Sequence, residues 1–168
     1  MPRRSVVVLA LASAALVLAA ASPAGAQTTV SGSFHGGTTR AEAPSCPGVI
    51  CGDGTLAGFG DFTFAYVPES FEQLSRSCFA LTATMTLTFA SGDELVLDTA
   101  GTACWAGNAA NAPGSQRSWG NPVTDSGSWT VASGTGDFAG ASGDGTFVMR
   151  AAGAALHGTI EGTLELAG

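Results

Sequence analysis

Residues 78–90 alternate strictly between two kinds of side chain. The apolar positions are Phe79, Leu81, Ala83, Met85, Leu87 and Phe89. A period of two held over thirteen residues predicts a β-strand with one buried side and one solvent-facing side. Turn residues follow at 91–93 and residues 94–102 alternate again, so the two segments form a predicted hairpin.

Shorter stretches with the same period occur along the rest of the chain. They predict strands at 29–36, 57–67, 128–133, 145–150 and 156–166, which makes seven with the hairpin. The segment 106–126, rich in Asn, Gly and Pro, is the longest expected loop and has room for an eighth strand at 116–119. Residues 68–77 are expected to form no more than one helical turn. Tight turns are expected at the two Gly-Asp-Gly-Thr segments, 52–55 and 143–146.

These elements predict an all-β fold in a single domain. Successive antiparallel strands either close into a barrel or stack as a sandwich. Large inward residues interleaved with glycine, as at 156–166, are typical of a tightly curved sheet. We therefore predict one antiparallel, closed, eight-stranded β-barrel, with a β-sandwich as the alternative.

The first 26 residues have the pattern of a secretory signal peptide. Two arginines give a basic start, an apolar run extends over 6–21, and Ala24-Gly25-Ala26 matches the small-residue cleavage pattern. The run is shorter than the roughly 20 apolar residues that a membrane-spanning helix needs. We expect cleavage before Gln27, so that residues 27–168 are secreted as the β-barrel domain.

Charge restricts the partners of the secreted part. Four of the six basic residues lie after residue 26, and with 13 acids they give a net charge of −9. Nucleic acid and anionic membrane surfaces both bind cationic protein surfaces, so neither is expected as a partner. The sequence makes no prediction of oligomeric state.

Four cysteines in an exported chain predict two disulfides, for which three pairings exist. Cys46 with Cys51 is favoured because these two bound a short Pro-Gly loop. Cys78 falls opposite Cys104 when the hairpin folds about its turn, and this register favours the second bridge. No metal site is expected, since the chain has no C-x-x-C pair and both histidines lie far from the cysteines.

The most distinctive segment is 134–143, with the pattern G-T-G-x-F-x-x-A-x-G between two predicted strands. Its structural residues are Gly134, Gly136, Phe138, Ala141 and Gly143. The glycines allow a sharp turn, Phe138 is placed to plug the barrel end, and Ala141 keeps the returning chain close to the sheet. The motif resembles the turn motif of the dirigent proteins and allene oxide cyclase barrels, and of small secreted bacterial proteins with such a barrel.

This resemblance covers about residues 128–168 and implies an eight-stranded barrel rather than an activity. In dirigent proteins the cavity holds phenolic radicals, and in the cyclases a glutamate with an ordered water assists closure of a ring from an epoxide. The acids of the predicted strands fall mostly on outward positions: Asp61, Glu94, Asp98, Glu161 and Glu165. No carboxylate stands out as inward, and His35 and His157 are also outward. No catalytic residue is therefore assigned, and a non-catalytic protein is favoured.

Three tryptophans remain as candidates for binding. Trp129 is expected in the core, whereas Trp105 and Trp119 lie in or beside the long loop, where ligand-binding side chains often occur. We predict a secreted, non-catalytic barrel, without cofactor, that binds a small apolar ligand or a partner at its mouth. The alternatives are a dirigent- or allene oxide cyclase-like enzyme and a structural surface module.

Overall fold

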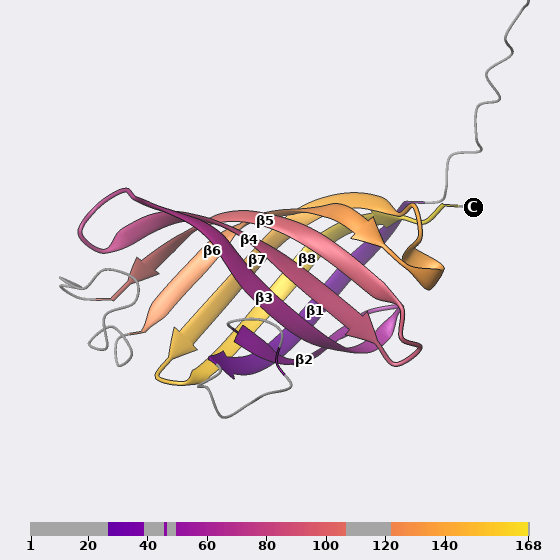
Figure 1. Ribbon diagram of the computed structural model, residues 1–168, viewed down its shortest axis with the longest axis horizontal. Helices are drawn as coiled ribbons and strands as arrows, with labels where there is room; N and C mark the ends of the chain where they lie inside the picture. The colour runs from indigo at the N-terminus through magenta and orange to yellow at the C-terminus, as the bar shows by residue number, and fades with distance from the viewer. Residues whose placement is uncertain (1–26, 39–45, 47–49, 107–121, 168) are drawn as a thin grey trace, which may run out of the picture.

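The chain forms an eight-stranded, closed, antiparallel β-barrel (Figure 1). The computed structural model describes residues 27–38, 46, 50–106 and 122–167. The strands are β1 (Gln27–Thr38), β2 (Ile50–Leu56), β3 (Gly60–Gln73), β4 (Cys78–Phe89), β5 (Glu94–Trp105), β6 (Val123–Gly134), β7 (Ser142–Ala152) and β8 (Ala155–Glu165). Each strand pairs with the next along the chain, and β8 returns to pair with β1. The predicted barrel is confirmed, and the sandwich is excluded by this closure.

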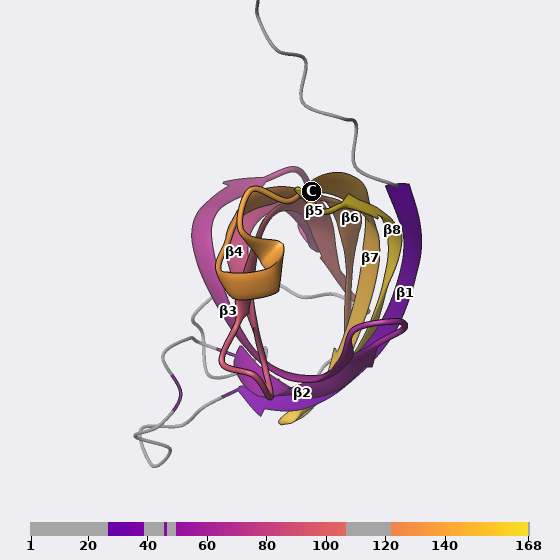
Figure 2. The ribbon, with the colours of Figure 1, turned by 90° about the vertical axis from the view of Figure 1, so that its right-hand side faces the viewer.

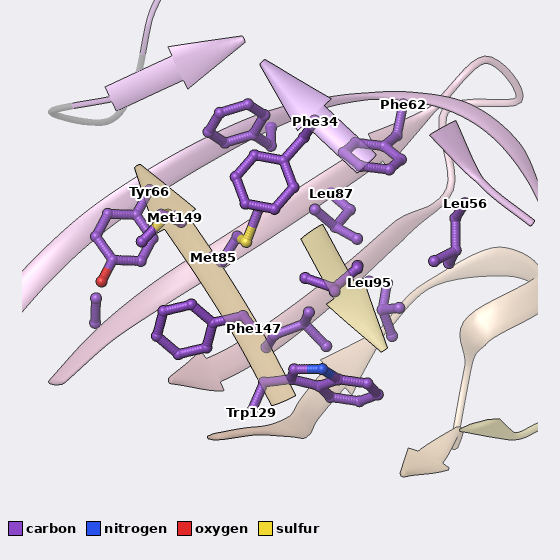
Figure 3. Close-up of a cluster of buried hydrophobic side chains, with 14 of the residues drawn as sticks. Phe34, Leu56, Phe62, Tyr66, Met85, Leu87, Leu95, Trp129, Phe147 and Met149 are labelled. Atoms are coloured by element: carbon purple, nitrogen blue, oxygen red, sulfur yellow. The ribbon is translucent and has the colours of Figure 1, made fainter. Parts of the chain in front are cut away.

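The barrel interior is filled by apolar side chains from all eight strands (Figure 3). Every apolar position of the 78–90 pattern is buried. Several of the large rings lie over inward glycines: a Cβ on Gly158 would collide with the ring of Phe34, and one on Gly145 or Gly162 would collide with Trp129. Glycine therefore makes room for the rings, which is how a narrow barrel holds so many aromatic residues.

The eighth strand is β2, in a segment where the sequence predicts a turn. Residues 52–55 belong to β2 and residues 143–146 to β7, so the expectation of two tight turns was wrong. Gly52 and Gly54 lie under the rings of Phe64 and Phe62, where a Cβ would come within 2.7 Å and 2.6 Å of a ring carbon. These glycines serve close packing rather than reversal of the chain. The other candidate for an eighth strand, 116–119, lies outside the described residues.

No helical turn forms at 68–77, where at most one was expected, because β3 continues to Gln73. Pairing of β2 with β3 ends at Ile50 and Tyr66. Within the described residues Pro68 pairs with Ala83 of β4 alone, and proline is tolerated where a strand is paired on one side. The β3–β4 register shifts between Pro68 and Ser70, and the two strands then continue as a hairpin that projects beyond the barrel (Figure 1).

One end of the barrel is plugged by the segment that carries the glycine-rich motif. The 3-10 turn η2 (Gly136–Phe138) folds inward over this end, as Figure 2 shows. The Phe138 side chain is buried and stacks on Phe89, with ring centroids 4.7 Å apart, and it packs against Phe59 at 5.4 Å. The start of β1 and the end of β8 pair at the same end, through Gln27 and Glu165.

Both predicted disulfides are present, Cys46–Cys51 and Cys78–Cys104. The second joins residues that lie directly opposite each other in the β4–β5 register, as the hairpin geometry required. Disulfides persist in oxidising compartments, so both bridges are compatible with an extracellular protein. The proposed signal peptide, 1–26, lies outside the described residues. Within the described ranges, no helix has the length and apolar character to cross a membrane.

Candidate functional site

One carboxylate lies inside the barrel. The alternation of β6 turns Asp125 inward together with Gly127 and Trp129, and its side chain is only 5% exposed. Thr99 and Asp125 are the buried polar side chains of the described residues. The expectation that no acid stands out on the inner face was therefore wrong, and the buried acid is the strongest functional candidate in the molecule.

Asp125 is held by a hydrogen bond that crosses the interior. The hydroxyl of Tyr66, on β3, donates to Asp125 Oδ2 on β6 at 3.2 Å. Figure 3 shows this hydroxyl at the border of the labelled apolar cluster. The nearby Thr99 hydroxyl donates to the backbone oxygen of Ala83 at 2.9 Å. The other carboxylate oxygen, Asp125 Oδ1, is buried and has no hydrogen-bond partner in the structure.

Burial shifts the ionisation of both groups. Removal from water raises the pKa of Asp125 to about 6, and the hydrogen bond from Tyr66 offsets part of that rise. Burial, with the negative charge of Asp125 beside it, raises the pKa of the Tyr66 hydroxyl well above its ordinary value. Near neutral pH the carboxyl group can therefore gain or lose a proton, while Tyr66 stays protonated and continues to donate.

The unpartnered oxygen, Asp125 Oδ1, faces the backbone of β5 at a glycine. A Cβ on Gly101, in β5, would lie 2.9 Å from Asp125 Oδ1 and 3.0 Å from the ring tip of Phe147. Only glycine at position 101 leaves room for the carboxylate in its present position. Any group that binds Oδ1 must consequently be small.

The acid lies one layer beneath an apolar ring at the end opposite the plug, which we call the mouth. The ring consists of partly buried side chains, namely Ile50, Trp105, Val123 and Ala151. Trp105 makes an edge-to-face contact with Phe79, with centroids 5.3 Å apart. On the projecting hairpin, Phe71 pairs with the inward-facing Leu81 but is 50% exposed. The mouth thus combines exposed aromatic surface with a buried acid below it.

The three tryptophans singled out in the sequence differ in where they lie. Trp105 is part of the mouth, whereas Trp119 lies outside the described residues. Trp129 is in the core, 2% exposed, and its indole N–H donates to the backbone oxygen of Thr146 at 3.1 Å. Of the two proposed binding residues, the structure places one, and it is adjacent to the layer of Asp125.

The outer wall offers weaker candidates. His35 Nε2 lies 3.1 Å from Asp53 Oδ2, and both side chains are more than 60% exposed. They border a hollow of about 530 Å³ that crosses β1–β4, and a second hollow of about 340 Å³ lies over β4–β6. His157 lies opposite His35 in the β1–β8 register and is also exposed. Among the described residues, no three His, Cys, Asp or Glu side chains are placed to hold a metal ion.

Asp125 was missed because the predicted strand began too late. The sequence interpretation placed the strand at 128–133, whereas β6 begins at Val123. The available signal was the alternation itself: extending the inward positions of Trp129 back by two steps reaches Gly127 and Asp125. A charged residue on the inner face of a strand is a functional signal.

Comparisons with protein-family models, with curated proteins and with solved structures find no match to this chain. Function therefore has to be inferred from the barrel itself. The resemblance of segment 134–143 to the dirigent and allene oxide cyclase turn motif stays a prediction.

Proposed function

We propose that the protein is a secreted, non-catalytic barrel that binds a small, mainly apolar ligand at its mouth. The signal-peptide pattern of residues 1–26 and the two disulfides support export. The packed interior below Tyr66 leaves the mouth, rather than the barrel centre, as the place for a ligand. Sites of this kind are mostly apolar, with a few well-placed polar groups.

The observation that carries the proposal is the unpartnered, buried Oδ1 of Asp125 beneath exposed aromatic surface. A buried acceptor without a partner costs about 1–3 kcal/mol, and a carboxylate costs more. Such a group is retained where something else compensates, and a bound ligand provides that compensation. Phe71, half-exposed on the projecting hairpin, supplies apolar area that a ligand can cover.

Native mass spectrometry of the protein with a panel of small apolar compounds tests the proposal. Phe71→Ser should weaken the binding of the best compound by roughly tenfold, because about 1–2 kcal/mol of apolar contact is lost. Val148→Ser is the matched control, since Val148 is 38% exposed but lies on the outer wall. If no compound in the panel binds, or if both variants lose affinity equally, a structural surface module becomes the better interpretation.

An enzyme is the second candidate, and Asp125 is the observation that favours it. A buried carboxyl group with a pKa of about 6 can give or take a proton near neutral pH. The motif resemblance to dirigent and cyclase barrels would place such a group in a reactive cavity. Stereoselective product formed from a phenolic or epoxide substrate, and lost in Asp125→Asn, would establish activity, whereas a racemic product identical to the protein-free control would exclude it.

A further inference from the structure

The groups around Asp125 have no donor hydrogen left for its second oxygen, Oδ1. The Tyr66 hydroxyl hydrogen is already given to Oδ2, and the Thr99 hydroxyl hydrogen to the Ala83 backbone. What remains unused is acceptor capacity, above all the two lone pairs of Oδ1. A ligand that completes this site must therefore bring hydrogen-bond donors rather than acceptors.

The site also lacks a positive charge. Tyr66 is the other titratable side chain on the inner faces of the described strands. The basic side chains of the described residues lie elsewhere: Arg76 is exposed on the β3–β4 turn, and the outward-facing ones on β1, β7 and β8 are His35, Arg150 and His157. An ionised Asp125 consequently has no counter-ion within the described part of the chain, and burial of an unpaired carboxylate is unfavourable. A net charge of −9 after residue 26 adds a long-range attraction for cations.

The mouth above the acid fits a ligand with both a cationic and an apolar part. Trp105 is partly exposed there and is held edge-to-face on the buried ring of Phe79, and aromatic faces attract ammonium groups as well as apolar ones. Gly101 and Phe147 restrict the space next to Oδ1, so the head group has to be compact. A primary ammonium is more compact than a quaternary ammonium or a guanidinium, so it suits this restriction best.

We infer that Asp125 is the recognition point for a primary ammonium group carried on a small apolar ligand that binds at the mouth. This inference depends on the proposed ligand-binding function and names the class of ligand. The ammonium donates to Oδ1 and neutralises the carboxylate, while the apolar part covers Phe71 and Trp105. Because burial raises the pKa of Asp125 to about 6, the carboxylate that binds a cation predominates at pH 7.5.

Two probes of similar shape, 2-phenylethylamine and propylbenzene, separate the inference from the function on which it depends. Affinities are measured by titration calorimetry at pH 7.5 for the wild type, Asp125→Asn and Asp144→Asn. Asp144 is exposed on the outer wall of β7, so its variant changes the net charge equally and serves as the control. The wild type should bind the amine at least about tenfold more tightly than propylbenzene, as expected for a hydrogen-bonded ion pair. Asp125→Asn should abolish that preference, and Asp144→Asn should keep it.

Each remaining outcome has a definite meaning. Equal affinity of the two probes, unchanged in Asp125→Asn, overturns the inference while leaving a ligand-binding mouth intact. Binding of neither probe overturns the inference and the proposed function together. A second measurement needs no variant: the carboxyl carbon resonance of Asp125 in the wild type should titrate at lower pH when 2-phenylethylamine is present, and an unmoved titration curve counts against the inference.

Discussion

Asp125→Asn should raise the free energy of unfolding of the unliganded protein at neutral pH. The size of the effect follows from the raised pKa of Asp125. Burial raises the pKa of Asp125 from 3.8 to about 6, a shift of about two units. Each unit corresponds to about 1.4 kcal/mol of difference between the two protonation states. Ionised Asp125 therefore lowers the free energy of unfolding by about 3 kcal/mol, and asparagine at this position removes that penalty because it cannot ionise.

The sign follows from which state holds the proton. Between pH 4 and pH 6 the folded protein keeps the Asp125 proton that the unfolded chain has already lost, so stability falls as pH rises through this window. Below pH 4 both states are protonated and the penalty is absent. Above pH 6 both are ionised and the penalty is complete. The variant lacks this slope, and its advantage should grow from pH 4 to pH 7 and then remain constant.

Urea unfolding at a series of pH values measures the effect. At each pH the free energy of unfolding of the wild type is subtracted from that of Asp125→Asn. The informative quantity is the change in this difference between pH 4 and pH 7.5, because the cost of burying an amide is the same at both pH values and cancels. Asp144→Asn, on the outer wall, should show a change close to zero. If the pH curves of the wild type and Asp125→Asn run parallel within about 0.5 kcal/mol, the claim that burial controls this carboxyl group is refuted.

Three other predictions concern the same barrel. Tyr66→Phe removes the hydrogen-bond donor of the Asp125 carboxylate, so it should destabilise the fold by about 1–3 kcal/mol at pH 7.5 and raise the pKa of Asp125 further. Urea unfolding measures the first effect, and carboxyl NMR measures the second. Replacing Cys78 and Cys104 together by serine should lower stability by about 3 kcal/mol without changing the barrel, as judged by unfolding and circular dichroism, whereas unaltered stability would contradict a bridge between them. Phe138→Ala should lower the free energy of unfolding by about 3–5 kcal/mol because the plug is a buried ring stacked on other rings, and a loss below 1 kcal/mol would show that the end stays closed without it.

Much of the fold follows from alternation alone, and the exceptions have physical causes. The β4–β5 hairpin has large apolar residues at every second position, so its strands and its disulfide register were predictable. β2 was not, because glycine occupies its inward positions 52 and 54 and the bulky side chains of that face come from β3. Pro68 has the signature of a strand end, but β3 is paired with β4 on both sides of it, so the strand continues past Pro68.

The candidate site was less predictable than the fold. Trp105 was proposed on the basis of its place beside the long loop, and it does lie in the mouth. Asp125 lies in a glycine- and serine-rich segment, where weak hydrophobic contrast hides the period of two. Its partner, Tyr66, lies 59 residues earlier in the sequence, and only closure of the barrel brings them together. No local pattern encodes a contact between β3 and β6.

The first and last strands of the barrel, β1 and β8, have a consequence for how the protein can be held. Gln27 and Glu165 pair at the plugged end, and Ala167 lies beside Gly140 in the connection that forms the plug. A bead, sensor surface or fused protein attached just before β1 or just after β8 is therefore coupled to the plugged end (Figure 1). The mouth, at the opposite end of the barrel, then points away from the support, whether the attachment precedes β1 or follows β8.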